Sequence, residues 1–501
     1  MSAKDNTAVE MAAVEMTAVE KTEAEKTESQ MKNRSMVLWA ILSLSMANAL
    51  VGTGISPALG VIRQNFPDAP GVLVQMIVSL PSLMVIAVAI PFAWLSRRYS
   101  VRKLCAAGLV LFLAGGLMGG LASGIYTLVL TRILIGAGYG LMMPLSVGLL
   151  SYFFTREEQH RLNGGIVIWS SVSSIICMVL AGYLAAISWR AVFLVYLFGI
   201  PCLWLCLKHI PDVTVTGAGE AAGDDRTRRA RGNLGVIRKT WVYGAGTFVV
   251  FVGYFAILNN CSSIILSEGL ISGEKVGIIM SFQTVSSLVT GLYIGKLKKL
   301  LGRYMSTFIW LCSIGGLLSL YAKNSLALTM LGLVLFGIAL ASAVGTFNAE
   351  ACIACERDES LAAGSVIMFM RSLGQFSSPL VLGFMARTAG ASDIRFPYEG
   401  AALLSVVMMG VFWVNGLVRG GLLKPKFNPE LCRDIKSSLH ERQRNVSFIR
   451  ELVFCSYTVI RVPAVTVHPL NPRCSYPGNP ALHPRPHLCL PGERMVSAPL
   501  S

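Results

Sequence analysis

Residues 93–103 read Ala93-Trp94-Leu95-Ser96-Arg97-Arg98-Tyr99-Ser100-Val101-Arg102-Lys103, which is a basic turn between two long apolar stretches. The stretch before this turn covers residues 72–95, and the stretch after it covers residues 103–123. Because an α-helix rises about 1.5 Å per residue, about 20 apolar residues suffice to cross the hydrocarbon part of a bilayer. The pattern therefore predicts two membrane-spanning helices that are joined by a short turn at the membrane surface.

The same alternation of apolar stretches and polar connections continues in both directions along the chain. Hydrophobic residues make up 54% and charged residues 14% of the 501 positions, whereas soluble domains contain about 25% charged residues. This composition excludes a soluble enzyme and predicts an all-α membrane protein. The twelve predicted spanning segments are 36–58, 72–95, 103–123, 125–153, 163–187, 190–208, 241–266, 273–296, 304–322, 325–350, 360–386 and 398–418.

The basic residues indicate how the chain is oriented in the membrane. The formal net charge is +16, and Lys and Arg concentrate in the connections after the second, fourth, sixth and eighth segments. Cytoplasmic loops of membrane proteins carry such an excess of Lys and Arg. The distribution therefore predicts that both termini are cytoplasmic, and that the partner is a lipid bilayer and not a nucleic acid.

A polar connection over residues 209–240 divides the predicted helices into two bundles of six, at 36–208 and 241–423. Setting Ser79 against Ser281 repeats the order of apolar helix, basic turn and apolar helix, as expected of two pseudo-repeated halves. Beyond the bundles, an acidic low-complexity tail is predicted over 1–31 and a Pro-rich tail over 424–501. The first tail is expected to be disordered or a frayed helix and the second to be disordered, and both are expected to be cytoplasmic.

Two motifs resemble those of the major facilitator superfamily, and the resemblance extends over about residues 36–423. The turn at 93–103 is similar to the signature Gly-x-Leu-x-Asp-Arg-x-Gly-Arg-Arg, with Arg97 in place of the acidic residue. The second copy of this turn has Lys299 at the same position. A further motif, an arginine followed by glycines, is matched by Arg132, Gly136, Gly138, Gly140 and Pro144.

The resemblance implies a bacterial-type transporter of twelve helices in two six-helix bundles. It also implies a small-molecule substrate, a coupling ion, a monomer in the cell membrane, no metal and no cofactor. In the superfamily, the acidic residue of the first signature holds the inner gate. Both copies in this chain lack that residue, so the basic residues of the two turns have two interpretations: they belong to an altered gate, or they only fix the orientation of the helices in the membrane. The residues expected in the gating loops are Arg97, Arg98, Arg102, Lys103, Lys299, Gly302 and Arg303.

Two arginines lie inside predicted spans, Arg132 and Arg371, whereas no Asp or Glu is predicted near the middle of the membrane. Charged groups are costly in lipid and usually face the interior of a helical bundle. The central cavity is therefore expected to be electropositive. Arg371 has three interpretations: a contact for an anionic substrate, a coupling residue, or a link between helices. Arg132 has two interpretations: a structural or coupling role, or direct contact with the substrate.

Polar or aromatic side chains at six further positions could line the substrate pathway. Each of these side chains could instead form a hydrogen bond or a packing contact between helices. The candidates are Asn48, Asn259, Asn260, Gln283, Gln375 and Trp169.

Three functions, two of them transporters and one of another class, follow from these observations. The first is a secondary transporter that moves a small organic solute, either an anion or another polar metabolite, by alternating access. A multidrug efflux transporter of the same superfamily is the second, and a non-transporting membrane sensor with a transporter fold is the third. An enzyme is not expected, because the predicted helices contain no cluster of His, Asp or Glu.

Overall fold

The computed structural model describes residues 36–46, 50–154, 156–210, 226–323, 325–355, 359–391 and 393–418. The elements in these ranges are α-helices and 3-10 helices, and the described residues contain no strand. The predicted all-α class is thereby confirmed. The tails 1–31 and 424–501, Asn48, and residues 211–225 of the predicted linker lie outside the described residues.

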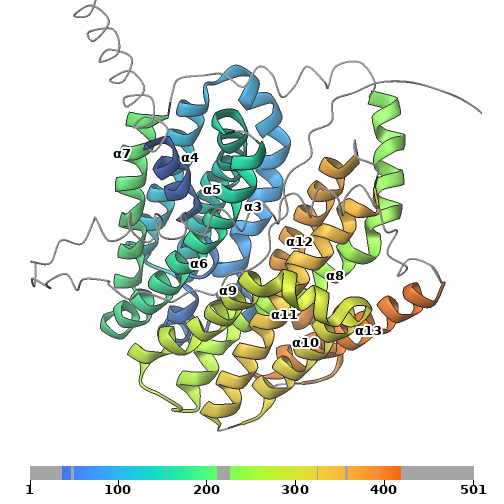
Figure 1. Ribbon diagram of the computed structural model, residues 1–501. Helices are drawn as coiled ribbons and strands as arrows, with labels where there is room; N and C mark the ends of the chain where they lie inside the picture. Colours follow the sequence, from blue (N-terminus) through green and yellow to red (C-terminus); the bar gives the residue numbers. More distant parts are fainter. Residues whose placement is uncertain are drawn as a thin grey trace, which may run out of the picture. The chain divides into compact units, whose positions relative to one another are not determined.

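In the first half of the chain, the first described helical residues are 36–46 and 50–52 (Figure 1). They are followed by the 3-10 helix η1 (Ser56–Ala58), which contains Pro57, and by α2 (Leu59–Asn65). Proline lacks a backbone N–H. At the start of a helix this costs no hydrogen bond, because an N–H at that position would have no partner within the helix. The following elements are α3 (Gly71–Arg98), α4 (Val101–Gly120), α5 (Ile125–Phe153), α6 (Arg156–Ile187), η2 (Ala191–Phe198) and α7 (Gly199–His209).

The second half begins with α8 (Arg226–Ser267), so the last part of the predicted linker is helical. The 3-10 helix η4 (Gly273–Lys275) leads into α9, and η5 (Gly302–Tyr304) leads into α10. The remaining bounds are α9 (Val276–Leu301), α10 (Met305–Tyr321), α11 (Leu326–Ile353), α12 (Ser360–Thr388) and α13 (Phe396–Val418).

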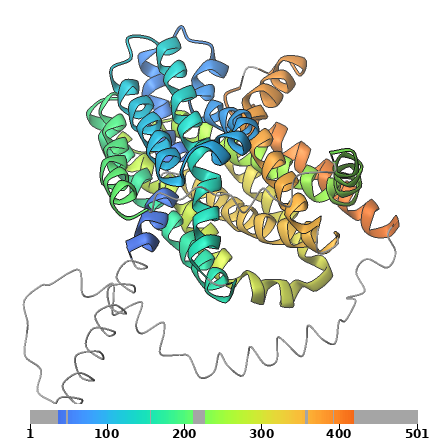
Figure 2. The same cartoon turned by 90° about the horizontal axis from the view of Figure 1, so that it is seen from above.

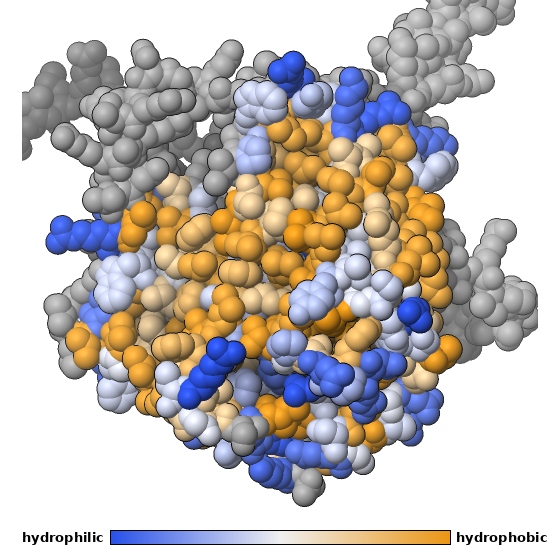
Figure 3. All heavy atoms as spheres, turned by 180° about the vertical axis from the view of Figure 1, so that it is seen from behind, coloured by the Kyte–Doolittle hydropathy of each residue, from blue (hydrophilic) through white to orange (hydrophobic). Residues whose placement is uncertain are grey.

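Within the described residues, ten helical stretches are long and apolar enough to cross a membrane. One of them, Gly273–Tyr321, contains both α9 and α10, whereas α12, which carries Arg371, is not among the ten. On the face drawn in Figure 3, apolar side chains cover the middle and hydrophilic side chains gather above and below them. The chain is a multi-pass membrane protein, and the number of twelve spans stays a prediction.

Glycines allow close contact at equivalent places in the two halves. A Cβ on Gly108 of α4 would lie 3.0 Å from the carbonyl oxygen of Gly138 in α5. In the second half, a Cβ on Gly316 of α10 would lie 2.9 Å from the carbonyl oxygen of Gly332 in α11. Because each site lacks room for a side chain, the backbones pack directly on each other, as is common in membrane helices.

The two halves lie side by side (Figure 2). Several contacts join them, among which α3 packs on α12, α6 packs on α9, and η1 with α2 packs on α8. These contacts bring together segments that are far apart in the sequence. They also bound the space in which the candidate site lies.

Candidate functional site

Hydrogen bonds between uncharged groups connect η1 and α2 to α8. The hydroxyl of Ser56 donates to the carbonyl oxygen of Leu258. The backbone N–H of Gly60 donates to the hydroxyl of Ser262 at 3.2 Å. Since Gly60 lacks a side chain, α2 can approach α8 closely enough for this contact.

The first part of α3 contacts the same stretch of α8. The side-chain amide of Gln75 donates to the carbonyl oxygen of the Asn260 side chain at 2.8 Å, and the Asn259 amide donates to the Ser79 hydroxyl at 3.1 Å. These four of the hydrogen bonds between the halves, at Ser56, Gly60, Gln75 and Ser79, are here called the seam.

A direct backbone contact between α6 and α9 closes the same end of the molecule. A Cβ on Gly182 would lie 2.8 Å from the backbone nitrogen of Gly277 and 3.0 Å from its Cα. Gly182 is near the end of α6 and Gly277 near the start of α9. Because successive spans run in opposite directions, these glycines and the seam lie at one end, which we call the closed end.

A cavity of about 150 Å³ lies between the halves and takes residues from both. Hydroxyl, amide and aromatic side chains make up most of its wall. Arg371 is the one charged residue among those that line it, and neither Asp nor Glu is among them. The lining residues are Val51, Gly52, Thr53, Ser82, Val85, Tyr139, Met143, Ser170, Ser174, Tyr254, Phe255, Arg371, Ser372 and Gln375.

Arg371 enters the cavity from α12 and rests against an aromatic ring. Its guanidinium carbon is 4.9 Å from the centroid of the Phe251 ring, a distance at which a cation is attracted to the face of the ring. Within the described residues, Arg371 forms no ion pair. Among its lining residues, the cavity therefore has one positive charge and no carboxylate to neutralise it.

Gln375 lies one helical turn after Arg371 and lines the same cavity. The hydroxyl of Ser82 on α3 donates to the carbonyl oxygen of the Gln375 side chain at 2.8 Å. This bond joins the two halves beside the cavity. Gln375 is thus both part of the cavity wall and a contact between the halves.

The chain matches the sequence profile of the Major Facilitator Superfamily over residues 41–379. It belongs to the major facilitator superfamily.

Curated superfamily relatives match only part of the chain. An uncharacterized transporter of Escherichia coli (strain K12), YebQ, is 26% identical over 179 residues, which are 35% of this chain and 38% of that protein. A putative multidrug resistance protein of Klebsiella pneumoniae, MdtD, is 27% identical over 160 residues, which are 32% of this chain and 34% of that protein. The chain therefore spans about a third of the length of each of these two relatives.

Solved superfamily structures resemble this fold over most of their length. The nucleoside transporter NupG superimposes with a TM-score of 0.61 and 14% identity, over 78% of this chain and 100% of that one. A bacterial homologue of the human lysosomal transporter Spinster gives a TM-score of 0.60 and 17% identity, over 76% and 95%. At these identities, the likeness supports the fold alone.

The superfamily arginine motif lies in α5, where its glycines face neighbouring helices. A Cβ on Gly136 would lie 2.7 Å from the Cα of Pro81, and a Cβ on Gly140 would lie 2.9 Å from the Cβ of Val88. Both neighbours belong to α3. Gly138 faces α4 instead, so the glycines bring three helices together. Pro144 is within α5.

Arg132, the first residue of this motif, lies outside the cavity wall. It is 1% exposed, and its Nη1 donates to the hydroxyl of Tyr196 at 3.0 Å. Its guanidinium carbon is 4.8 Å from the centroid of the Phe193 ring. Its Nε and Nη2 have no hydrogen-bond partner within the described residues. The two intramembrane arginines, which look alike in the sequence, therefore have different surroundings.

The other predicted pathway residues divide into several environments. Asn259 and Asn260 contribute to the seam. Gln283 is buried in α9, and its amide nitrogen has no hydrogen-bond partner within the described residues. Trp169 packs edge-on against Trp39 at 5.8 Å between ring centroids. Gln375, by contrast, is in the cavity wall.

In the first predicted gating loop, the guanidinium of Arg98 is 5.6 Å from the Trp94 ring. Lys103 is exposed and Arg102 half-buried. The side chain of Arg97 is outside the described part of the structure.

In the second predicted gating loop, Lys299 is exposed, and Arg303 donates from Nη2 to the Tyr304 hydroxyl at 2.6 Å. Gly302 ends α9 with φ +48°, a left-handed conformation that favours glycine. Its neighbour Lys298, which the motif did not single out, forms an ion pair with Glu350 at 2.7 Å. This pair joins the ends of α9 and α11.

Tyr139 and Tyr254 line the cavity, but the sequence analysis did not single them out. Tyrosines are also common where membrane helices meet the lipid surface. Nothing in the sequence therefore distinguishes Tyr139 and Tyr254 from the other tyrosines of the chain.

Arg395 was also missed. It is 1% exposed and donates from Nε and Nη2 to the carboxylate of Glu268 at 2.8 and 2.6 Å. Its Nη1 donates to the carbonyl oxygens of Leu320 and Ala322. One side chain thus ties the ends of α8 and α10 to the connection before α13.

Proposed function

We propose that this chain is a secondary transporter that moves a small organic anion across the cell membrane by alternating access. The observation that carries the proposal is Arg371, a cation in a cavity between two helical halves that forms no ion pair with the residues that the structure describes. A guanidinium binds carboxylates and phosphates through paired N–H donors. No carboxylate of the lining competes for that attraction.

The dimensions of the cavity favour a small solute. Its volume is about 150 Å³, whereas pockets for drug-sized ligands measure roughly 300–1,000 Å³. The hydroxyls of Ser82, Ser170 and Ser174 and the ring of Tyr254 line the space around Arg371. These groups suit a compact anion with additional polar atoms.

The concentration of Lys and Arg supports an orientation in which both termini and the end opposite the closed end face the cytoplasm. The closed end then faces outward. Transport requires the seam and the contact between Gly182 and Gly277 to separate while the opposite end closes. We further propose that the protein works as a monomer, is driven by a coupling ion, and performs no covalent chemistry.

Multidrug efflux is the second candidate function. It is favoured by the similarity to MdtD, a putative multidrug resistance protein. A cationic drug, however, is expected to need a buried carboxylate, and the cavity wall has none.

The test is uptake of radiolabelled mono- and dicarboxylates and organic phosphates into proteoliposomes. Arg371→Gln should reduce uptake of the transported anion by about 10- to 100-fold, since charged hydrogen bonds contribute roughly 1.5–3 kcal/mol. Arg371→Lys should restore part of it. Arg387→Gln, an exposed arginine on the same helix, is the matched control and should leave uptake unchanged.

Unchanged anion uptake by Arg371→Gln would contradict the proposal. Efflux of a cationic dye by the wild-type protein, without uptake of any anion, would favour the second candidate.

A further inference from the structure

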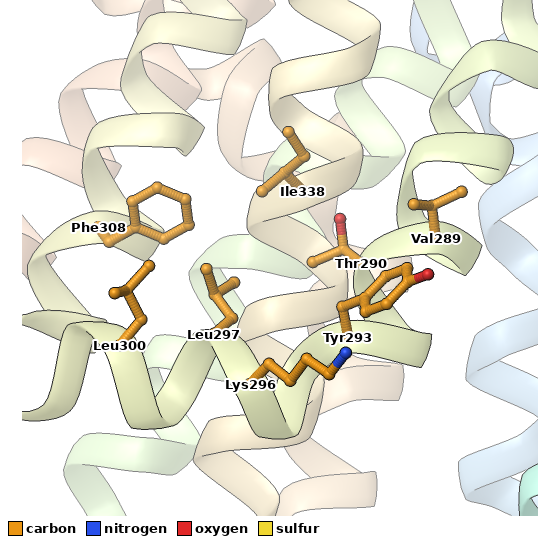
Figure 4. Close-up of a pocket in the computed structure, with 8 residues that line it drawn as sticks. All are labelled: Val289, Thr290, Tyr293, Lys296, Leu297, Leu300, Phe308 and Ile338. Carbon is orange, nitrogen blue, oxygen red and sulfur yellow. The ribbon is translucent and has the colours of Figure 1, made fainter. Parts of the chain in front are cut away.

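A second and larger cavity lies away from the substrate site, in a groove between α9 and α10 (Figure 4). Its volume is about 590 Å³. The two helices have few contacts with each other, and both pack instead on α11, which forms the floor of the groove. The lining residues are Val289, Thr290, Tyr293, Lys296, Leu297, Leu300, Phe308 and Ile338.

The wall of this groove is almost entirely apolar. Aliphatic and aromatic side chains come from three helices, as Figure 4 shows for Leu297 on α9, Phe308 on α10 and Ile338 on α11. Leu300, at one end of the groove, is 82% exposed. In a membrane protein, an exposed apolar groove of this kind is filled by lipid chains and not by water. Its surface therefore fits an acyl chain.

One cationic side chain, Lys296, lines the groove. Lys296 runs along α9 so that its ammonium is 5.2 Å from the centroid of the Tyr293 ring (Figure 4). Within the described residues, Lys296 forms no ion pair. Its neighbour Lys298 is neutralised by Glu350 at 2.7 Å, whereas Lys299 is exposed and adds further positive charge. The end of the groove is therefore electropositive.

We propose that this groove binds an anionic phospholipid of the adjacent leaflet. The phosphate contacts the ammonium of Lys296, and an acyl chain lies along Leu297, Phe308 and Ile338. Charge complementarity selects the headgroup, because a lysine near the membrane surface attracts anionic lipids. The apolar wall of the groove selects a membrane lipid over a soluble phosphate.

The position of the groove links the lipid to the closed end. The same helix, α9, carries the groove residues in its second half and Gly277 in its first turn. A bound lipid fills the space between α9 and α10, and so favours the arrangement in which these helices stay apart. The inference rests on the membrane-spanning fold and not on the proposed anion substrate.

The experiment measures lipid binding to the purified full chain by native mass spectrometry. The probes are phosphatidylglycerol and phosphatidylcholine with identical acyl chains. The wild-type protein should bind phosphatidylglycerol more tightly. Lys296→Gln should weaken phosphatidylglycerol binding about fivefold and leave phosphatidylcholine binding unchanged, while Lys296→Arg should retain the preference.

Two further variants make the test specific. Lys275→Gln removes an exposed lysine just before the other end of α9 and should have no effect. Ile338→Trp places a bulky ring on the floor of the groove and should weaken binding of both lipids.

Equal binding of the two lipids to the wild-type protein would overturn the proposal, as would equal effects of Lys296→Gln and Lys275→Gln. Soluble glycerol phosphate should not displace the lipid. Displacement would assign the site to a free phosphate instead.

Discussion

Replacement of Gly182 by alanine tests whether the closed end depends on direct backbone contact. The added Cβ would lie 2.8 Å from the backbone nitrogen of Gly277 and 3.0 Å from its Cα. Ordinary contact begins at about 3.4 Å, so α6 and α9 must move apart by several tenths of an ångström. Neither backbone atom can rotate away as a side chain could.

Overpacking of this kind costs about 1–3 kcal/mol. Because the cost applies only while the end is closed, it shifts the equilibrium toward the open arrangement by roughly 5- to 150-fold. Alanine also favours a helix over glycine by about 1 kcal/mol. That gain occurs in both arrangements and therefore cancels.

The matched control is Gly165→Ala on the same helix, where an added Cβ meets nothing within 4 Å. Hydrogen–deuterium exchange of the protein in nanodiscs is the assay, with peptides from residues 59–71 and 270–280 as reporters of the closed end. Gly182→Ala should speed exchange in both peptides relative to wild type. Gly277→Ala, which brings its Cβ still closer to the Met178 carbonyl, should speed it further. Equal exchange for Gly182→Ala and Gly165→Ala would refute the reasoning.

Two other predictions concern the connections at the ends of the second half. Arg395→Met leaves the Glu268 carboxylate without its bidentate partner, so stability should fall by about 3–5 kcal/mol. Unfolding in an SDS titration measures this loss, and recovery in the double variant with Glu268→Leu distinguishes an unpaired charge from a packing defect. The hydrogen bond from Lys323 holds the pKa of Asp393 below its usual value. The ionised Asp393 carboxylate therefore makes its full contribution to stability above about pH 4, and this contribution is lost as the pH falls through the lowered pKa. The difference in unfolding midpoint between wild type and Asp393→Asn should therefore vanish in acid, and a constant difference would contradict this origin.

Much of the fold could be predicted from local pattern, because bilayer thickness fixes the length of an apolar helix. The basic turn before α4 and the glycines of α5 follow from short-range sequence alone. The start of α8 could not be predicted, since its first turns are polar and look like a linker. Helix length there is not limited by the thickness of the membrane.

The candidate site was predicted less completely, because the sequence does not show which neighbouring helix or cavity each face of a helix meets. Arg132 and Arg371 are both arginines in apolar stretches, but one meets Tyr196 and the other an open cavity. The partners Ser79 and Asn259 are 180 positions apart. Arg395 follows Asp393 in a short connection and resembles a surface residue, although its side chain is buried.

The seam has a consequence for how the protein responds to its surroundings. Its four hydrogen bonds join uncharged groups, and together they contribute about 2–6 kcal/mol. Ionic strength and proton concentration act on charges and leave such bonds unaffected. A dependence of transport rate on salt or pH should therefore report on the ligand, the coupling ion or charged groups outside the seam, and not on the strength of the seam itself.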